Sequence, residues 1–279
     1  MTAQQKLAQL GGMIRYEFLL CWRQRGILVM VLSLLVLFIP ITIQTSTEGT
    51  IAQLHKTGLS EADIREKVAL GFGMTLWPII QLMLLVLAPM IAADGIAKDR
   101  QYGVSETLNA LPLNTMIYLL GKLIGLALSI LAGLAFVMVI IGLVWHFVVG
   151  PFALSTYLSL WLFAALPMAI LNPGMSLLLA SGQSRRRIAL LIGFGFAILT
   201  VFLLGASSGT FMGGTLSLWD YFNPARPLLL LHFTFTPDLS SVFKPVTNND
   251  VLLSWLTGTL EFIVLAVIAW RWMRRQQNQ

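Results

Sequence analysis

The chain of 279 residues is 57% hydrophobic and only 11% charged, with a mean hydropathy of +0.82. A soluble domain cannot hide that much apolar surface, because its exterior must be largely polar. Residues 123–184 contain no Asp, Glu, Lys or Arg, and charges are costly in a bilayer core. The single cysteine excludes an internal disulfide and any metal site built from several cysteines. These features predict an all-α integral membrane protein.

Residues 1–25 predict an amphipathic helix that lies on the membrane surface. Its apolar stripe at helical spacing consists of Leu7, Leu10, Ile14, Phe18 and Cys21. Residues 26–279 predict a domain of six transmembrane helices, because apolar runs long enough to cross a bilayer alternate with polar connections. The expected spans cover about residues 26–43, 70–92, 117–149, 155–180, 188–204 and 251–270.

Local signals refine these boundaries. Ser60, followed three residues later by Asp63, resembles a capping box at the start of the second helix. Pro167 and the Asn172-Pro173-Gly174 sequence predict kinks in the fourth span. Residues 205–250 are rich in Gly, Ser, Thr and Pro, and we expect a long extracytoplasmic loop there.

The basic residues indicate the orientation. Of the 18 Lys and Arg residues, 13 fall on the side of the membrane where the six predicted spans place both termini. The positive-inside rule then places both termini in the cytoplasm of a multi-pass protein of the cell membrane. Because these charges are spread between apolar spans rather than gathered in one patch, the expected partner is membrane lipid and not nucleic acid.

The connection between the second and third spans carries the clearest functional pattern. Gly103 ends one helix, Ser105 can cap another, and Pro112 ends it. Leu108 and Leu111 share one face of this short cytoplasmic helix. An apolar face without a partner in its own chain indicates a docking site for a cytosolic protein.

This stretch resembles the coupling region of ABC-2 type permeases, the membrane subunits of one class of ABC exporters. That family shows an acid-Arg pair, a Gly-Thr, a Leu-rich turn, a Pro, and a Gly-Lys that opens the third span. The matching residues here are Asp99-Arg100, Gly103, Leu108 and Leu111, Pro112 and Gly121-Lys122, whereas Val104 replaces the usual Thr. The wider resemblance covers nearly the whole chain.

The resemblance implies a permease that pairs with a second permease, expected to be a copy of itself, and with separate ATPase subunits. ATP and Mg would bind in those partners, and this chain would hold no cofactor, metal or catalytic residue. No phosphate-loop motif occurs, because Gly121-Lys122 is followed by Leu123-Ile124. We expect Lys122 to lie at headgroup level. The substrate does not follow from the sequence.

The same resemblance assigns coupling to the ATPase to Asp99, Arg100, Gly103, Glu106, Leu108, Leu111 and Pro112. In the expected contact, the two leucines are buried anchors and the charged residues form a polar rim. We call Gly103–Pro112 the predicted coupling segment.

Other charged residues allow two interpretations each. Glu261 lies in the middle of the last span, so it is a candidate for the transport path, although it could instead pair with a neighbouring helix. Asp94 is expected at the inner end of the second span, facing headgroups or pairing with a Lys or Arg. Arg185, Arg186 and Arg187 form either a topology anchor or a second contact with the ATPase.

Two other classes of function remain open. A secondary transporter or channel would show inverted repeats or several intramembrane charges, and we see no repeat and only one clear mid-span acid. The sequence Gly205-Ala206-Ser207-Ser208-Gly209 superficially resembles the nucleophile turn of an intramembrane hydrolase, with His146 or His232 as base. No spacing favours that reading.

Overall fold

The computed structural model describes residues 2–23, 25–45, 60–103, 114–162, 166–211 and 248–277. Within these ranges all regular secondary structure is helical, which confirms the predicted all-α class. The helices are α1 (Ala3–Arg23), α2 (Gly26–Thr45), α4 (Glu61–Ala93), α5 (Gly95–Gln101), α7 (Thr115–Val148), α8 (Leu154–Leu160), α9 (Leu166–Ala180), α10 (Arg186–Phe211) and α13 (Asn248–Gln277).

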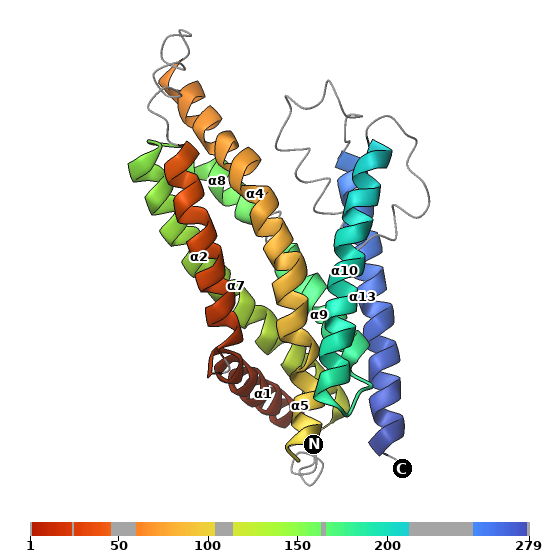
Figure 1. Cartoon of the computed structure of the whole chain (residues 1–279). Coiled ribbons are helices and arrows are strands. Elements are labelled where there is room, and N and C mark those ends of the chain that lie inside the picture. The colour runs from red at the N-terminus through yellow and green to blue at the C-terminus, as the bar shows by residue number, and fades with distance from the viewer. Residues whose placement is uncertain are drawn as a thin grey trace.

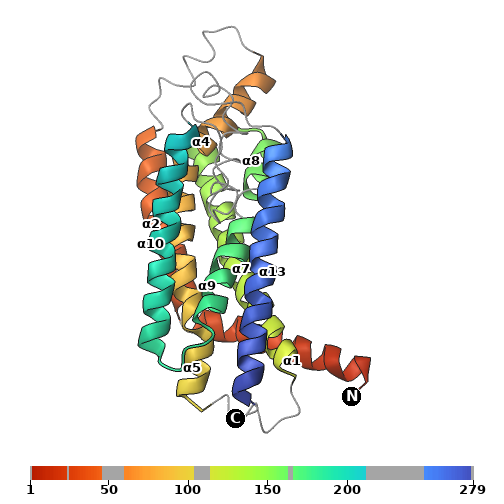
Figure 2. The same cartoon turned by 90° about the vertical axis from the view of Figure 1, so that its right-hand side faces the viewer.

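The long helices run along one axis and form an elongated bundle (Figures 1 and 2). α1 lies across one end of the bundle, and the short helix α5 lies at the same end. The carboxy-terminal end of α13 is also found there, while α8 lies toward the opposite end. The two ends of the chain therefore lie on the same side of the bundle.

Polar residues fix the starts of two of these long helices. The Ser60 hydroxyl accepts a hydrogen bond from the Asp63 N–H at 3.2 Å, which confirms the predicted cap of α4. The Asn114 side chain accepts one from the Met116 N–H at 2.9 Å and caps α7. Each cap satisfies a backbone donor that has no partner within its own helix.

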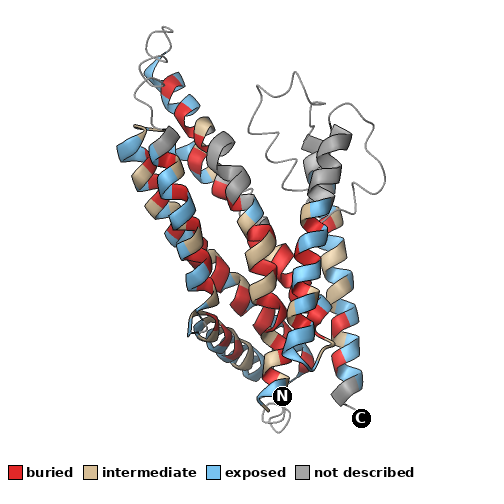
Figure 3. Ribbon diagram, viewed as in Figure 1, coloured by how far each residue is buried: buried red, intermediate tan, exposed pale blue. Residues whose placement is uncertain are grey.

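Among the described residues, three helical segments are long and apolar enough to cross a membrane: Gly26–Ile43, Thr115–Val148 and Leu256–Arg275. Large apolar side chains on the outer sides of the helices are exposed, among them Val36 (69%), Phe147 (81%) and Phe202 (71%), and Figure 3 shows how exposed positions line the outside of the bundle. Such a surface is suited to lipid rather than water. α4, α9 and α10 also run along the bundle, but the count of six spans stays a prediction.

One helix boundary differs from the sequence prediction. The expected fourth span, residues 155–180, covers nearly all of α8 and the whole of α9, and residues 163–165 between these helices lie outside the described part of the chain. α10 continues to Phe211, so the Gly205–Gly209 sequence is helical and not a turn. Residues 212–247 of the expected loop lie outside the described part of the chain.

Candidate functional site

Two glycines of α7 allow α1 to pack unusually close to it. Gly121 and Gly125 are four residues apart and so lie on one face of the helix. A Cβ atom on Gly121 would lie 2.7 Å from Cβ of Met13, and one on Gly125 would lie 2.6 Å from Cβ of Glu17. These separations are too short for real side chains. Small residues at this spacing are typical of closely packed helices in membranes.

The close contact surrounds a buried cluster of charges. Lys122 is fully buried, and its Nζ lies 2.7 Å from Oε2 of Glu17 and 2.9 Å from Oδ2 of Asp99. Its ammonium also donates to the carbonyl of Gly95 at 3.1 Å. The Tyr118 hydroxyl donates to Oδ2 of Asp99 at 2.8 Å. One lysine therefore joins α1, α5 and α7 at the end of the bundle where α1 lies.

This cluster contains two carboxylates, Glu17 and Asp99, for one ammonium group. Burial raises the pKa of Glu17, and although Lys122 acts in the opposite direction, the nearby charge of Asp99 adds to the increase. Burial therefore favours the protonated form of Glu17. Protonation of Glu17 would leave the ion pair between Lys122 and Asp99 in place.

A second set of contacts ties α5 to the turn between α9 and α10. Nε of Arg186 lies 2.8 Å from Oδ2 of Asp94, the residue that joins α4 to α5. Arg100 donates to the carbonyl of Gln183 at 3.4 Å. Asp94 therefore pairs with an arginine, as one of the two sequence interpretations expected. α5 is thus held to α7 by the ion pair of Asp99 with Lys122, and to the turn between α9 and α10 by Arg100.

The predicted coupling residues are described only in part. Asp99 is 3% exposed inside the ion cluster, so its predicted place on an exposed polar rim is wrong. Arg100 is half-buried, and Gly103 adopts a φ of 69°, a conformation that favours glycine at a helix end. Glu106, Leu108, Leu111 and Pro112 lie outside the described residues. Their coupling role stays a prediction.

Glu17 was not predicted as part of this site. Lys122 lies in the protein interior, where Glu17 and Asp99 compensate its charge, and its depth at headgroup level stays a prediction. The buried face of α1 contains Met13, Glu17 and Cys21. Only Cys21 belongs to the predicted apolar stripe, so the buried face is rotated from that stripe, and it includes an acid. The signal that could have indicated this is the pair of glycines beside Lys122, since close packing there requires a partner helix.

Glu261 lies in α13, away from this cluster. It is half-buried, and no ion pair to it is found among the described residues. The next residue, Phe262, fills the space beside Gly174 of α9, where a Cβ would meet its ring. α13 therefore packs on α9 next to Glu261, and both the transport-path and the pairing interpretation of this acid stay open.

The arrangement is suited to holding α1, α5 and α7 in register. Cys21 is buried beside Glu17, and burial raises the pKa of its thiol to about 12, so little reactive thiolate forms. In the described part of the chain, no group of three His, Cys, Asp or Glu side chains could hold a metal ion. No protein-family model matches this chain, and no curated protein matches it.

Proposed function

We propose that this chain is the permease subunit of an ABC-type exporter, which forms the substrate pathway and couples it to ATP hydrolysis by a separate ATP-binding subunit. The supporting observation is the ion pair of Asp99 with Lys122. These residues belong to the two outer elements of the motif that resembles ABC-2 permeases, and they lie on either side of the predicted coupling segment. Contact between them ties the beginning and the end of that connection together.

This geometry suggests how a movement would be transmitted. ATP and Mg bind in the partner ATPase, whose closure displaces the coupling segment. α5 and α7 flank that segment and are joined to α1 through Lys122. The Asp94–Arg186 pair connects the same region to α10. A displacement at the segment would therefore move several helices together instead of bending one connection.

The proposal includes a location and an assembly. The chain would cross the cell inner membrane six times, with both termini in the cytoplasm, and would pair with a second copy of itself. The excess of Lys and Arg on one predicted side and the position of α1 and the end of α13 at the same end of the bundle support this orientation. The broad apolar surface of the helices is available to lipid and to a second permease.

The test is an aspartate on the apolar face of the coupling segment. Leu108→Asp would place an unpaired carboxylate in the proposed contact with the ATPase, where its desolvation costs several kcal/mol. We expect the variant to insert normally but to lose its ATPase on purification, or to retain it without stimulated ATP hydrolysis. Asn109→Asp adds the same charge to a different face and is the matched control.

Leu111→Asp should behave like Leu108→Asp, because the two leucines share a face. If both leucine variants keep the ATPase and transport at the level of the control, the coupling assignment is wrong. A secondary transporter or channel would then be the better explanation. Transport that disappears with Ser207→Ala or Ser208→Ala, accompanied by loss of a hydrolytic activity, would instead favour the hydrolase.

A further inference from the structure

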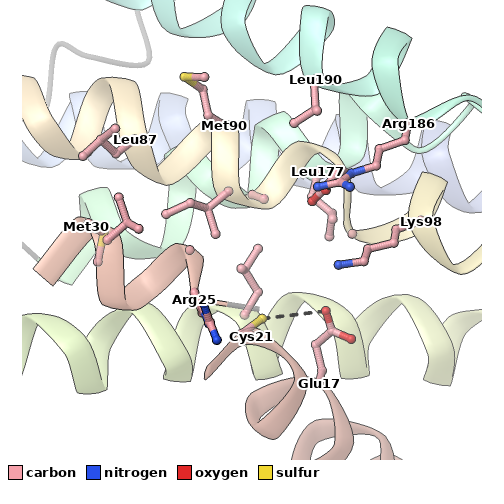
Figure 4. Close-up of a pocket in the computed structure, with 17 residues that line it drawn as sticks. Glu17, Cys21, Arg25, Met30, Leu87, Met90, Lys98, Leu177, Arg186 and Leu190 are labelled. Atoms are coloured by element: carbon pink, nitrogen blue, oxygen red, sulfur yellow. Dashed lines mark hydrogen bonds and ion pairs between the residues drawn. The ribbon is translucent and has the colours of Figure 1, made fainter. Parts of the chain in front are cut away.

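A cavity of about 340 Å³ opens beside the ion cluster, between α1 and α2 on one side and α4, α5 and α10 on the other. Its volume is in the lower part of the range for small-molecule sites. Figure 4 shows that Arg25 and Glu17 come from one wall, and Lys98 and Arg186 from the opposite one. Glu17 and Cys21 of α1 and Lys98 of α5 line the cavity, and both helices lie at one end of the bundle (Figure 1), so the cavity is at the level of a membrane surface if α1 lies in that surface.

The charged side chains of the cavity leave an excess of positive charge. Its lining includes Arg25, Lys98 and Arg186, but only two acids, Glu17 and Asp94. Both acids are already paired, Glu17 with a lysine of α7 and Asp94 with Arg186. No ion pair within the described residues includes Arg25 or Lys98. Two cations are thus available to an anionic ligand.

The rest of the lining is apolar and adaptable. Met30, Leu87 and Met90 lie on the side away from Lys98 and Arg186, as Figure 4 shows, and Leu190 of α10 adds an apolar side chain beside Arg186. Methionine side chains are flexible and adjust to different apolar shapes. Basic pockets between membrane helices at the cytoplasmic side are suited to anionic lipid headgroups. A ligand that satisfies both walls has a negative head and a hydrocarbon tail.

We propose that this cavity binds an anionic amphiphile of the phospholipid type. Arg25 and Lys98 contact the phosphate of its head, and the first carbons of its chain lie against Met30, Leu87 and Met90. The proposal goes beyond the permease assignment and is independent of it, because it concerns binding by the isolated chain and needs neither the ATPase nor transport.

Binding can be measured on the purified chain in a non-ionic detergent by native mass spectrometry. The probes are dioctanoyl phosphatidylglycerol, dioctanoyl phosphatidylcholine and glycerol 1-phosphate. We expect the phosphatidylglycerol to bind one per chain and about tenfold or more tightly than the phosphatidylcholine, since hydrogen bonds to charged groups are the stronger ones. Glycerol 1-phosphate, which has the head but no tail, should not displace it.

Variants then locate the site. Arg25→Gln and Lys98→Gln should each weaken phosphatidylglycerol binding about tenfold, whereas Lys98→Arg should retain it. Arg185→Gln is the matched control, because Arg185 is exposed next to Arg186 but does not line the cavity. Equal binding of the two lipids, or unchanged affinity in both glutamine variants, would overturn the proposal. Full displacement by glycerol 1-phosphate would also overturn it and indicate a site for a soluble anion.

Discussion

Replacing Lys122 with methionine tests whether the ion cluster holds together the end of the bundle where α1 lies. Methionine keeps most of the length of the side chain but removes its charge. The substitution eliminates the contacts of Nζ with Glu17 at 2.7 Å, with Asp99 at 2.9 Å and with the Gly95 carbonyl at 3.1 Å. Two buried carboxylates would then face each other without a cation.

The expected magnitude follows from burial. Lys122 is fully buried, and Glu17 is 4% exposed, so water cannot replace the lost partner. Removing one member of a buried pair costs about 3–5 kcal/mol, because the remaining charge is left uncompensated. For a chain of this size, that loss corresponds to a decrease in the melting midpoint on the order of 10 °C.

The assay is thermal unfolding of the purified chain in detergent, followed by loss of the monodisperse peak on size exclusion. Lys6→Met is the control, because Lys6 is exposed on the same α1 that carries Glu17. Adding Glu17→Gln and Asp99→Asn to Lys122→Met should recover much of the stability, since no charge is then left buried. A midpoint for Lys122→Met within about 2 °C of the control, well below the expected shift, would refute the reasoning.

Three further predictions concern other charged or terminal positions. In a Cys21→Ser background, a cysteine at Ser240 should react with an impermeant thiol reagent in intact cells and one at Gln277 should not; the opposite pattern would reverse the orientation. Glu261→Gln should alter transport with normal yield if this acid lines a polar path, and should lower the yield of folded protein if it pairs with a neighbouring helix. Unchanged transport together with unchanged yield would contradict both roles. Because burial raises the pKa of Glu17 above 4.5, its contribution to stability is full below that pH and is lost as the pH rises through the raised value. Glu17→Gln should therefore flatten the fall in melting midpoint above pH 4.5, and an unchanged slope would contradict the raised pKa.

The helices were predictable because apolar length is a local property of the sequence. The first span begins at Gly26 as predicted, and Ser60 caps α4 through the spacing that suggested it. The end of α10 was predicted too early, because Gly, Ser and Thr after residue 204 resemble a loop in composition and yet continue the helix.

The ion cluster could not be predicted, because its members are far apart along the chain. Glu17 and Lys122 are separated by 105 residues, and no local spacing relates them. The orientation of α1 was missed for a related reason. In a membrane protein, lipid and neighbouring helices are equally apolar, so a hydrophobic stripe does not say which of the two it meets. The glycines at 121 and 125 mark the face of α7 that contacts another helix. The sequence alone does not say which helix that is.

Stability alone gives no reason for a buried lysine at this position, because an apolar set of similar volume would often be as stable. What the charges add is register. Lys122 meets Glu17, Asp99 and the Gly95 carbonyl together in one arrangement of α1, α5 and α7, and a shift of one helical turn would leave a charge buried without a partner. α5 therefore cannot slide along α7 at low cost. A displacement of either helix would carry the other with it, as the proposed coupling role requires.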